Sequence, residues 1–382
     1  MNNHQKPAPS TKTILLLVCI LLACLVIVAA VGFKVIHEEN ARLLGESDTR
    51  LSFLQRLAYD VTFFLKRDSL QQKNENLVDS IIEVQAGKPL DEILVELKSN
   101  KLVTDSSLLR NVLIYTGTDR NILPGKYPIA AGSSIIEIAS ILRDPNASLI
   151  DFAVLPGWRK EEIAAVLPTS GLSVVPEDFL KVVNQPVQDE RLLALGVNSY
   201  EGFLSPGVYA FHRNITVMDF VDSLSGRFRA ELTADLIDAY ANQGLSVYQA
   251  VTLSFIIRRE AVMDEEKPTI ASVFLNRLNI GMPLQSDPTV QYALGYRSEW
   301  GWWKSPLNLD DLQADSPYNT YIIAGLPPAP ISNPDIASLR AVAFPTDTKY
   351  FYFRALCDGS KKHVFSETLE EHIKNSCPES ES

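Results

Sequence analysis

The chain has few of the residues on which metal, phosphate and nucleic-acid chemistry depends. It holds five histidines in 382 residues, and they are scattered without a metal-ligand spacing such as HExxH. It has no glycine-rich phosphate loop. The formal net charge is -11, and no basic stripe suited to a nucleic acid is present. These absences predict a protein that uses no metal and no other cofactor, and that binds no nucleic acid.

Cysteine is also scarce, with four residues in the chain. Cys19 and Cys24 lie inside a long apolar run, whereas Cys357 and Cys377 lie near the C-terminus. Disulfides persist in oxidising compartments outside the cytoplasm. If the C-terminal part is exported, the sequence allows a disulfide between the last two cysteines without requiring one.

One uninterrupted apolar run, Ile14 to Phe33, dominates the N-terminus. At about 1.5 Å per residue, a helix of this length crosses a hydrocarbon core of about 30 Å. Lys6 and Lys12 precede it without any acidic residue, so the positive-inside rule predicts a cytoplasmic N-terminus and an external chain after Lys34. A cleaved signal peptide has a shorter apolar core, and the run continues well past Cys24, which argues against a lipid anchor there. A retained membrane anchor is therefore expected.

Three later segments share one layout, with an apolar lead-in, a glycine, and a Glu–Ile pair that opens an apolar stretch of helical spacing. The glycines are Gly87, Gly132 and Gly157, and each suits a tight turn with positive φ between a strand and a helix. Such units resemble LysM modules, which bind N-acetylglucosamine-containing glycans of cell walls. The alternative is a small packing subdomain without a ligand, because a fold does not fix a function.

The run from Ser246 to Met263 carries strong helical signals. Ser246 with Gln249 forms a capping-box start, and apolar residues follow at helical spacing. Glu260 falls on the face of the isoleucines one turn earlier. A carboxyl group at the edge of a buried face is partly desolvated, which raises its pKa and suits it to act as a general acid. The alternative is a surface ion pair with a basic neighbour such as Arg258.

Segments on either side of this helix carry local signals. The glycine, proline and aromatic residues of 200–211 predict a structured loop, whose rings either line a sugar cleft or pack in the core. Pro268 and Gly281 delimit a second helix. Asp287, directly before Pro288, is expected to cap a third.

Two further features lie nearer the C-terminus. Trp300, Trp302 and Trp303 form a cluster that is either a carbohydrate-stacking platform or a buried plug, and the plug is favoured. Asp358–Gly359 predicts the turn of a β-hairpin, followed by a closing helix.

Together these segments resemble the endolytic murein transglycosylases of the MltG (YceG-like) family, from the apolar run to about residue 375. The most specific parts are the Glu260 helix and the stretches ASVFLNRLNIGMPLQSDPTVQYALG and YNTYIIAGLPPAPISNP. The resemblance assigns catalysis to Glu260. It implies substrate binding at the residues that match other family positions, which are Glu201, Asn276, Gln285, Asp287, Tyr318, Asn319, Tyr321 and His363. Hydrogen bonding within loops and at helix ends is the alternative role for polar residues of this kind.

The chain departs from the family pattern at two places. The family helix carries two glutamates that flank a basic residue, and here Arg258 replaces the first of them. A cation two residues from Glu260 is expected to lower the pKa of its carboxyl group and to alter substrate preference. Gly207 stands after the proline of the EGFLSP loop, where the family often has aspartate.

The chemistry that the resemblance implies needs one carboxyl group. A lytic transglycosylase protonates the leaving oxygen of the MurNAc–GlcNAc β-1,4 bond, the C6 hydroxyl attacks the anomeric carbon, and the same carboxylate then accepts the hydroxyl proton. A glycosidase needs two carboxyl groups, about 5–5.5 Å apart for retention or about 6.5–9.5 Å for inversion. The candidates for a second carboxyl group are Asp264, Glu265, Glu266 and Asp287. Of these, Asp264 is expected to be exposed and Asp287 to be occupied as a cap.

The expected fold class is α+β, with a single N-terminal transmembrane helix, a LysM-like α/β subdomain and a C-terminal mixed α+β catalytic domain. The expected parts are a cytoplasmic tail (1–12), the transmembrane helix (13–34), a membrane-proximal helical segment that is either a stalk or an amphipathic element (35–78), the LysM-like subdomain (79–150), the YceG-like catalytic domain (151–377) and a disordered tail (378–382). The resemblance implies a single-pass protein of the inner membrane that acts outside the cytoplasm on peptidoglycan glycan strands, beside penicillin-binding synthases.

Three hypotheses follow from the sequence. The first is a membrane-anchored endolytic transglycosylase that leaves 1,6-anhydroMurNAc ends. The second is a glycoside hydrolase on the same substrate, which leaves reducing ends. The third is a non-catalytic wall-binding or scaffold protein, in which Arg258 marks a decayed active site.

Overall fold

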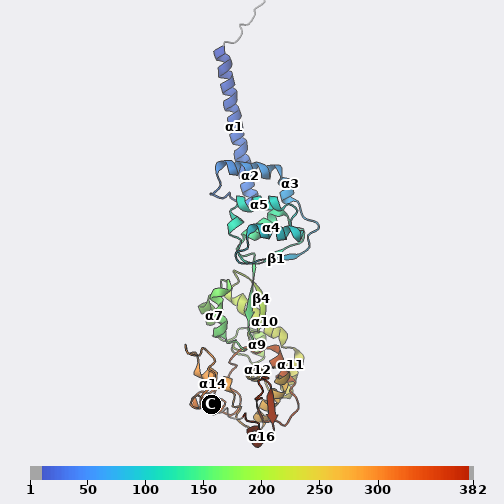
Figure 1. Ribbon diagram of the computed structural model, residues 1–382, viewed down its shortest axis with the longest axis vertical. Coiled ribbons are helices and arrows are strands. Elements are labelled where there is room, and N and C mark those ends of the chain that lie inside the picture. Colours follow the sequence, from blue (N-terminus) through green and yellow to red (C-terminus); the bar gives the residue numbers. More distant parts are fainter. Residues whose placement is uncertain (1–10, 378–382) are drawn as a thin grey trace, which may run out of the picture. The chain divides into compact units, whose positions relative to one another are not determined.

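The structure is a computed structural model that describes residues 11–377. The chain divides between Ile150 and Asp151 into two compact units. Residues 1–10, with Lys6 and most of the expected cytoplasmic tail, lie outside the described residues, as does the tail expected at 378–382. Figure 1 follows the elements along the chain. Their mixture of helices and antiparallel strands confirms the α+β prediction.

The first unit begins with a long helix, α1 (Thr11–Leu44). Its segment Cys19–Leu44 is long and apolar enough to cross a membrane, and its apolar window has no buried residue. The helix does not end near Lys34, because the residues that follow continue it and pack on α2 (Phe53–Leu65). With α3 (Arg67–Gln71), this makes the segment after the apolar run helical.

The rest of the first unit combines strands with helices. Its elements are β1 (Ser80–Val84), α4 (Leu90–Ser99), α5 (Ser106–Tyr115), the short 3-10 helix η1 (Thr118–Arg120), β2 (Gly125–Ile129) and α6 (Ile135–Arg143). β1 pairs with β2 in antiparallel register, from Ser80 opposite Ile129 to Val84 opposite Gly125. Tyr115 and Tyr127 are fully buried in the core that these elements share.

The three glycines of the repeat each connect a strand to a helix, as predicted. Gly87 joins β1 to α4, and Gly132 joins β2 to α6. Gly157 joins β3 (Leu149–Val154) to α7 (Lys160–Ser170). Their φ angles are 76°, 72° and 84°, in the left-handed region that favours glycine.

The second unit is mainly helical. After α7 its elements are α8 (Pro176–Val183), α9 (Glu190–Ala194), β4 (Gly207–His212), α10 (Val217–Glu231), α11 (Ala234–Asn242), α12 (Val247–Glu260), η2 (Asp264–Glu266), α13 (Lys267–Asn279), α14 (Asp287–Leu294), η3 (Asp311–Gln313), α15 (Ile336–Ala343), β5 (Tyr352–Ala355), β6 (His363–Ser366) and α16 (Leu369–Lys374). Part of the segment expected as a loop is therefore the strand β4. Its rings belong to the core, since Phe203 and Phe211 are buried.

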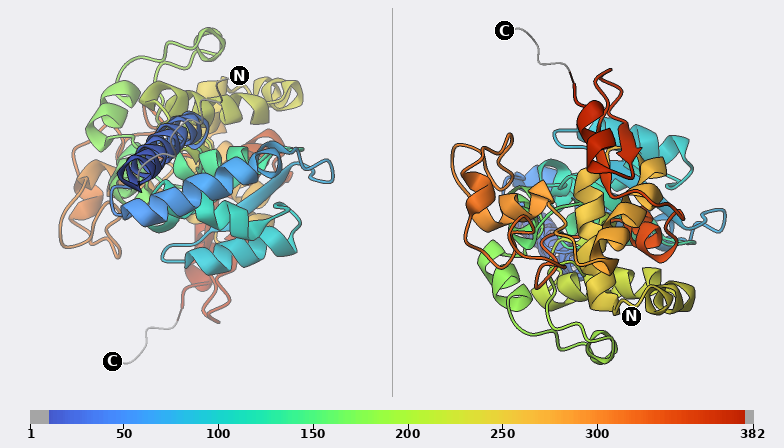
Figure 2. Two further views of the ribbon diagram at one scale, coloured as in Figure 1. Left: turned by 90° about the horizontal axis from the view of Figure 1, so that it is seen from above. Right: turned by 90° about the horizontal axis from the view of Figure 1, so that it is seen from below.

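α12 is the central element of the second unit. It packs against α11, α13, α14 and α15, and the stretch 250–257 is buried throughout. Figure 2 (right) shows the yellow and orange helices of this unit gathered together. The helix expected to reach Met263 ends at Glu260, because Ala261 adopts an extended backbone with φ -82° and ψ 124°.

The C-terminal hairpin has the predicted form. β5 pairs with β6 in antiparallel register, from Tyr352 opposite Ser366, and Gly359 in the turn has a φ of 75°. α16 follows it as the closing helix. A disulfide joins Cys357 to Cys377 with a Cα–Cα distance of 5.5 Å, so the pairing that the sequence allowed is present.

Candidate active site

Glu260 is placed by the way α12 begins and ends. The Ser246 hydroxyl accepts the backbone N–H of Gln249, and the Gln249 side chain accepts the backbone N–H of Ser246, which confirms the capping box. The buried middle of the helix fixes its rotation. Glu260 is its last residue, so the carboxyl group lies where the chain leaves the helix.

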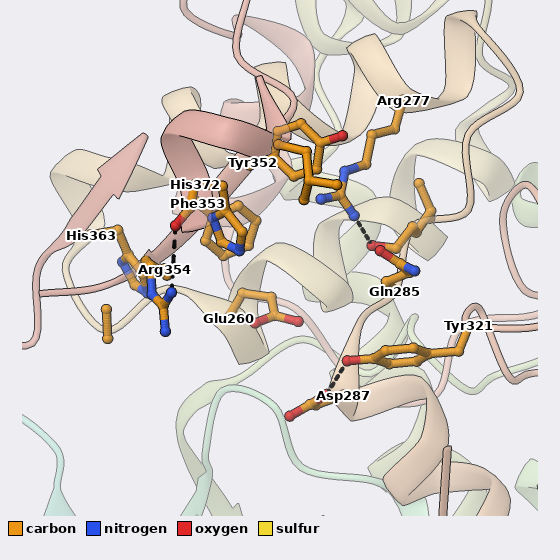
Figure 3. A pocket seen from close by; sticks show the side chains of 13 residues that line it. Glu260, Arg277, Gln285, Asp287, Tyr321, Tyr352, Phe353, Arg354, His363 and His372 are labelled. Atoms are coloured by element: carbon orange, nitrogen blue, oxygen red, sulfur yellow. Dashed lines mark hydrogen bonds between the residues drawn. The ribbon is translucent and has the colours of Figure 1, made fainter. Parts of the chain in front are cut away.

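The Glu260 carboxyl group faces a cavity of about 370 Å³ (Figure 3). Figure 3 places it between the paired Asp287 and Tyr321 and the side chains of the C-terminal hairpin. The walls come from α13, the loop after it, α14, the segment between η3 and α15, the hairpin and α16. The lining residues are Glu260, Arg277, Leu284, Gln285, Asp287, Tyr321, Tyr352, Phe353, Arg354, Ala355, His363, Leu369 and His372.

Burial raises the pKa of Glu260 to about 7, which confirms the expected direction. A hydrogen bond from Ser286 Oγ to Glu260 Oε1, at 2.6 Å, works against this rise because it stabilises the carboxylate. The negative charge of Asp287 adds to the rise, whereas Arg259 and Arg277 oppose it. Near neutral pH the group is therefore poised to release and to accept a proton.

Arg258 is directed to another partner. Its Nε lies 3.2 Å from Asp335 Oδ2 in an ion pair, and Asp335 also accepts hydrogen bonds from Lys267 Nζ. Arg259 lies over the Trp303 ring at 3.8 Å. The basic neighbours of Glu260 thus have partners of their own, and the surface ion pair that was the alternative for Glu260 is not formed among the described residues.

Arg277 holds the opposite wall in place. Its Nε donates to Phe351 O at 2.6 Å, directly before β5, and its Nη1 donates to Leu284 O at 2.6 Å. Gln285, next along the chain, has a φ of 51°, which is uncommon for a residue with a side chain and marks a position held by its surroundings. Backbone strain of this kind concentrates at functional sites.

Asp287 does not cap α14, so that prediction is wrong. Ser286 occupies the N-cap position, and Asp287 is the first residue of the helix. Its Oδ1 accepts a hydrogen bond of 2.6 Å from the Tyr321 hydroxyl. Its carboxylate is therefore available at the cavity wall beside Glu260.

The other candidates for a second carboxyl group lie elsewhere. Asp264 is 76% exposed and pairs with Lys267, and Glu265 is exposed. Glu266 accepts the backbone N–H of His363 and lies 2.8 Å from its Nδ1. Its role is to hold that histidine against the cavity. Among the four candidates, Asp287 is the one that lines the cavity with Glu260.

The structure brings five of the nine predicted site residues to the cavity. They are Glu260, Gln285, Asp287, Tyr321 and His363. The other four lie outside its lining. Asn276 donates to Thr348 O and Tyr350 O, and Asn319 donates to Leu312 O and Ala314 O. Tyr318 packs against Tyr292 with ring centroids 4.7 Å apart.

Glu201, the last of these four, belongs to a separate buried cluster. It is 3% exposed, and burial, aided by the charge of Glu161, raises its pKa to about 7. Lys160 lies beside it, with Nζ 3.8 Å from Oε2. Arg159, itself buried, contacts the rings of Tyr292 at 4.3 Å and Trp302 at 4.1 Å.

The tryptophan cluster packs against this region. Trp303 donates its Nε1–H to Glu162 at 3.2 Å and lies partly buried on the core. All three tryptophans are only partly buried, so the buried plug favoured from the sequence is not formed, although Trp303 packs on the core.

Sequence reasoning missed the cavity residues Arg277, Tyr352, Arg354 and His372, and also the buried Ser286, which donates to Glu260. Ser286 stands directly between two predicted site residues, so its position was a usable signal. Tyr352, Arg354 and His372, from the hairpin and α16, gave no signal in the sequence near Glu260, because only tertiary packing brings them to it.

The second unit defines a class of protein, an α+β domain in which an acid of raised pKa at a helix end faces a polar cavity. The chain belongs to the YceG-like family, whose model matches residues 82–377. This membership confirms the resemblance seen in the sequence.

Relatives in this family include named enzymes. The chain is 31% identical over 250 residues to the endolytic murein transglycosylase of Bacillus subtilis, covering 64% of this chain and 62% of that protein. It is 28% identical over 221 residues to the protein of the same name from Streptococcus pneumoniae, covering 53% of this chain and 39% of that protein. A crystal structure of a YceG-like protein from Listeria monocytogenes is 29% identical, with a TM-score of 0.55, and the match covers 78% of this chain and 99% of that one. The chain thus spans less than two thirds of the length of the two named transglycosylases.

Proposed function

We propose that the protein is a lytic transglycosylase that cleaves peptidoglycan strands, with Glu260 as its acid and base. The observation that carries the proposal is the Glu260 carboxyl group, with a pKa of about 7, at the wall of a polar cavity. The names of its relatives support peptidoglycan as the substrate.

In this reaction Glu260 donates its proton to the glycosidic oxygen of a MurNAc–GlcNAc β-1,4 bond as the bond from that oxygen to the MurNAc anomeric carbon breaks. The C6 hydroxyl of the same MurNAc attacks the anomeric carbon and gives its proton to the Glu260 carboxylate. The products are a 1,6-anhydroMurNAc end and a free GlcNAc hydroxyl, and the acid is restored. A carboxyl group with a pKa near the working pH suits both transfers.

The residues in and around the cavity have supporting roles in this proposal. Ser286 steadies the Glu260 carboxylate after it gives up its proton, because the hydroxyl donates to Oε1. Gln285, Tyr321 and His363 hydrogen-bond the glycan from the wall. Asn276 and Asn319 contribute by positioning the backbone around the cavity, as their hydrogen bonds to carbonyls support.

The first unit has an anchoring and binding role in the proposal. α1 crosses the inner membrane once, with its N-terminus in the cytoplasm, so that both units act outside it. The LysM-like subdomain, residues 79–150, contacts the glycan, and penicillin-binding synthases are the partners that the family resemblance implies.

The experiment that tests the proposal is mass spectrometry of peptidoglycan digested by the full chain in detergent. Glu260→Gln tests the acid, and Asp264→Asn, which removes an exposed carboxylate close by, is the matched control. Anhydro-terminated fragments from the wild type and Asp264→Asn, absent with Glu260→Gln, are the expected result. No cleavage by the wild type, on a substrate that a known transglycosylase cuts, would favour the wall-binding hypothesis.

The position of Asp287 favours a second candidate, a glycoside hydrolase. Its carboxylate is free of the capping role and lines the same cavity as Glu260, and its charge acts on that group. A hydrolase would leave reducing ends and would lose its activity in Asp287→Asn. A transglycosylase would keep its anhydro product in that variant, so the product and the variant together separate the two reactions.

A further inference from the structure

α2 presents two faces with different surroundings. One face is bound inside the first unit, where Asp60 and Phe63 are fully buried and the Phe63 ring packs edge-on against Tyr115 at 5.2 Å. The other face exposes large apolar side chains that recur at helical spacing and form one stripe. The members of this apolar stripe are Phe53, Leu54, Val61, Phe64 and Leu65, with exposed fractions from 41% for Val61 to 75% for Leu65.

The contacts of α2 fix it to α1 at the end of the apolar run. The Phe53 ring lies 5.6 Å from that of Phe33, the last residue of the run. Further along, Asp60 accepts a hydrogen bond of 2.9 Å from Asn40 Nδ2, and its other oxygen lies 2.8 Å from His37 Nδ1. Figure 1 shows α2 lying across α1 at this level. A buried carboxylate with these partners holds the helix in one orientation.

The position of α2 along α1 matches the depth of a membrane interface. If the run up to Phe33 crosses the hydrocarbon core, His37 and Asn40 lie about 6 to 10 Å beyond its edge, at about 1.5 Å per residue. Helices that lie in the interface bury their apolar face by about 5–10 Å at the boundary of headgroups and acyl chains. Because α2 lies across α1 at this depth, its apolar stripe is expected to contact lipid.

Three basic residues near the stripe have acidic partners, and Arg56, on α2 itself, donates its Nε to Leu51 O at 3.1 Å. Arg67 pairs with Glu39 at 2.7 Å, and Lys66 pairs with Asp105 at 3.1 Å. Arg50 pairs with Asp48. Attraction to anionic lipids is therefore a small contribution, and apolar contact is the main one.

We propose that α2 is an interfacial helix whose apolar stripe inserts into the membrane leaflet on the side of the folded units. The proposal rests on the proposed membrane anchor, α1. It gives the first unit a second attachment to the bilayer, which fixes the tilt of that unit as well as its distance from the membrane.

The test is a depth measurement on the full chain in phosphatidylcholine nanodiscs. Cys19→Ala and Cys24→Ala remove the free thiols, and a nitroxide is attached to one introduced cysteine at a time. Leu65→Cys reports the stripe, and Gln55→Cys reports the exposed polar side of the same helix. Relaxation by oxygen should exceed relaxation by a water-soluble nickel chelate at Leu65 by at least about threefold, and the order should reverse at Gln55.

Leu22→Cys, in the exposed apolar part of α1, tests the anchor separately. We call stronger relaxation by oxygen a lipid signal and stronger relaxation by the nickel chelate a water signal. A lipid signal at Leu22 with a water signal at Leu65 overturns the proposal and leaves the anchor in place. A water signal at Leu22 overturns both.

Spin–spin broadening at Leu65 that disappears on dilution with unlabelled protein assigns the stripe to a second copy and also overturns the proposal. A lipid signal at Leu65 that is the same with and without phosphatidylglycerol supports apolar insertion.

Discussion

Two carboxyl groups of the second unit have similar pKa values but different surroundings. Burial raises the pKa of both Glu260 and Glu201 to about 7. Glu260 opens onto a cavity and accepts a hydrogen bond from Ser286. Glu201 is 3% exposed and lies beside Lys160. A raised pKa alone therefore does not identify a catalytic acid, and access to a space that holds substrate is the second requirement.

The charged neighbours of Glu260 and Glu201 also differ in which protonation state they favour. The negative charge of Asp287 favours the protonated form of Glu260, which is the form that a general acid needs. Around Glu201, the cations Lys160 and Arg159 favour the charged form and partly offset the cost of burial. The first arrangement suits the proton transfer that we propose for Glu260, whereas the second places Glu201 beside the start of α7, where it accepts the backbone N–H of Lys160.

The largest expected effect is the loss of activity in Glu260→Gln. Removing a general acid and base should lower the rate by about 10² to 10⁴, whereas Glu201→Gln should change it by less than about threefold, because that group does not reach the cavity. Release of anhydro-muropeptides, quantified by mass spectrometry, measures both variants. Equal losses of activity in Glu260→Gln and Glu201→Gln would mean that access to the cavity does not distinguish the two carboxyl groups.

Glu201→Gln should instead change stability. The pKa of Glu201 is about 7 when folded and 4.5 as its ordinary value, so the folded state binds the proton more tightly. Wild-type stability is then complete below about pH 4.5 and falls as the pH rises toward 7. At pH 8 the variant should be more stable than wild type by up to roughly 3 kcal/mol.

All four tryptophans of the chain lie in the second unit, so urea unfolding followed by their fluorescence reports this effect. The difference between variant and wild type should shrink as the pH is lowered to 4. A difference that does not vary with pH would mean that Glu201 is charged in the folded protein.

Ser286→Ala should shift the pH dependence of activity toward alkaline pH. The hydroxyl stabilises the Glu260 carboxylate, so its removal raises the pKa further. Because the reaction starts with the protonated acid, the alkaline limb of the kcat/KM profile should move up by as much as about one pH unit. Glu201→Gln serves as the control, and its profile should match that of the wild type.

Asp287→Asn should give a smaller shift in the opposite direction. Loss of the negative charge lowers the pKa of Glu260, so the alkaline limb should move down by a few tenths of a pH unit, on the scale of a screened charge at a cavity wall. Asparagine can still accept the Tyr321 hydroxyl, which keeps the local structure. A shift in the same direction as Ser286→Ala would mean that Asp287 does not act on Glu260 through its charge.

Local sequence signals predicted the parts of the site that depend on local geometry. The capping box of α12, the glycine at each strand–helix turn and the hairpin turn at Gly359 all have the expected form. These features depend on backbone conformations and hydrogen bonds within a few residues, so a single sequence contains what is needed to predict them. The edge of a buried face, predicted for Glu260 from helical periodicity, is not what places it, because α12 is buried on all sides over 250–257 and Glu260 is its last residue.

Predictions that required competition between neighbours or packing across the chain were less accurate. Asp287 is a good N-cap residue, but Ser286 stands one position earlier and takes the cap position. Asn276 and Asn319 direct their amides to backbone carbonyls, which is the alternative that the sequence left open for them. Tyr352 and His372 reach the cavity from the C-terminal segment, which no pattern near Glu260 could indicate.

The burial of α12 on all sides constrains how the length of this helix can change. Each residue of a helix adds about 1.5 Å and a rotation of about 100°. A one-residue insertion or deletion after Ser246 would either turn Glu260 away from the cavity or rotate the whole buried stretch 250–257 out of its packing. A substitution on α12 changes one contact, whereas a change in the number of residues between Ser246 and Glu260 would lose either the packing of the helix or the place of the acid.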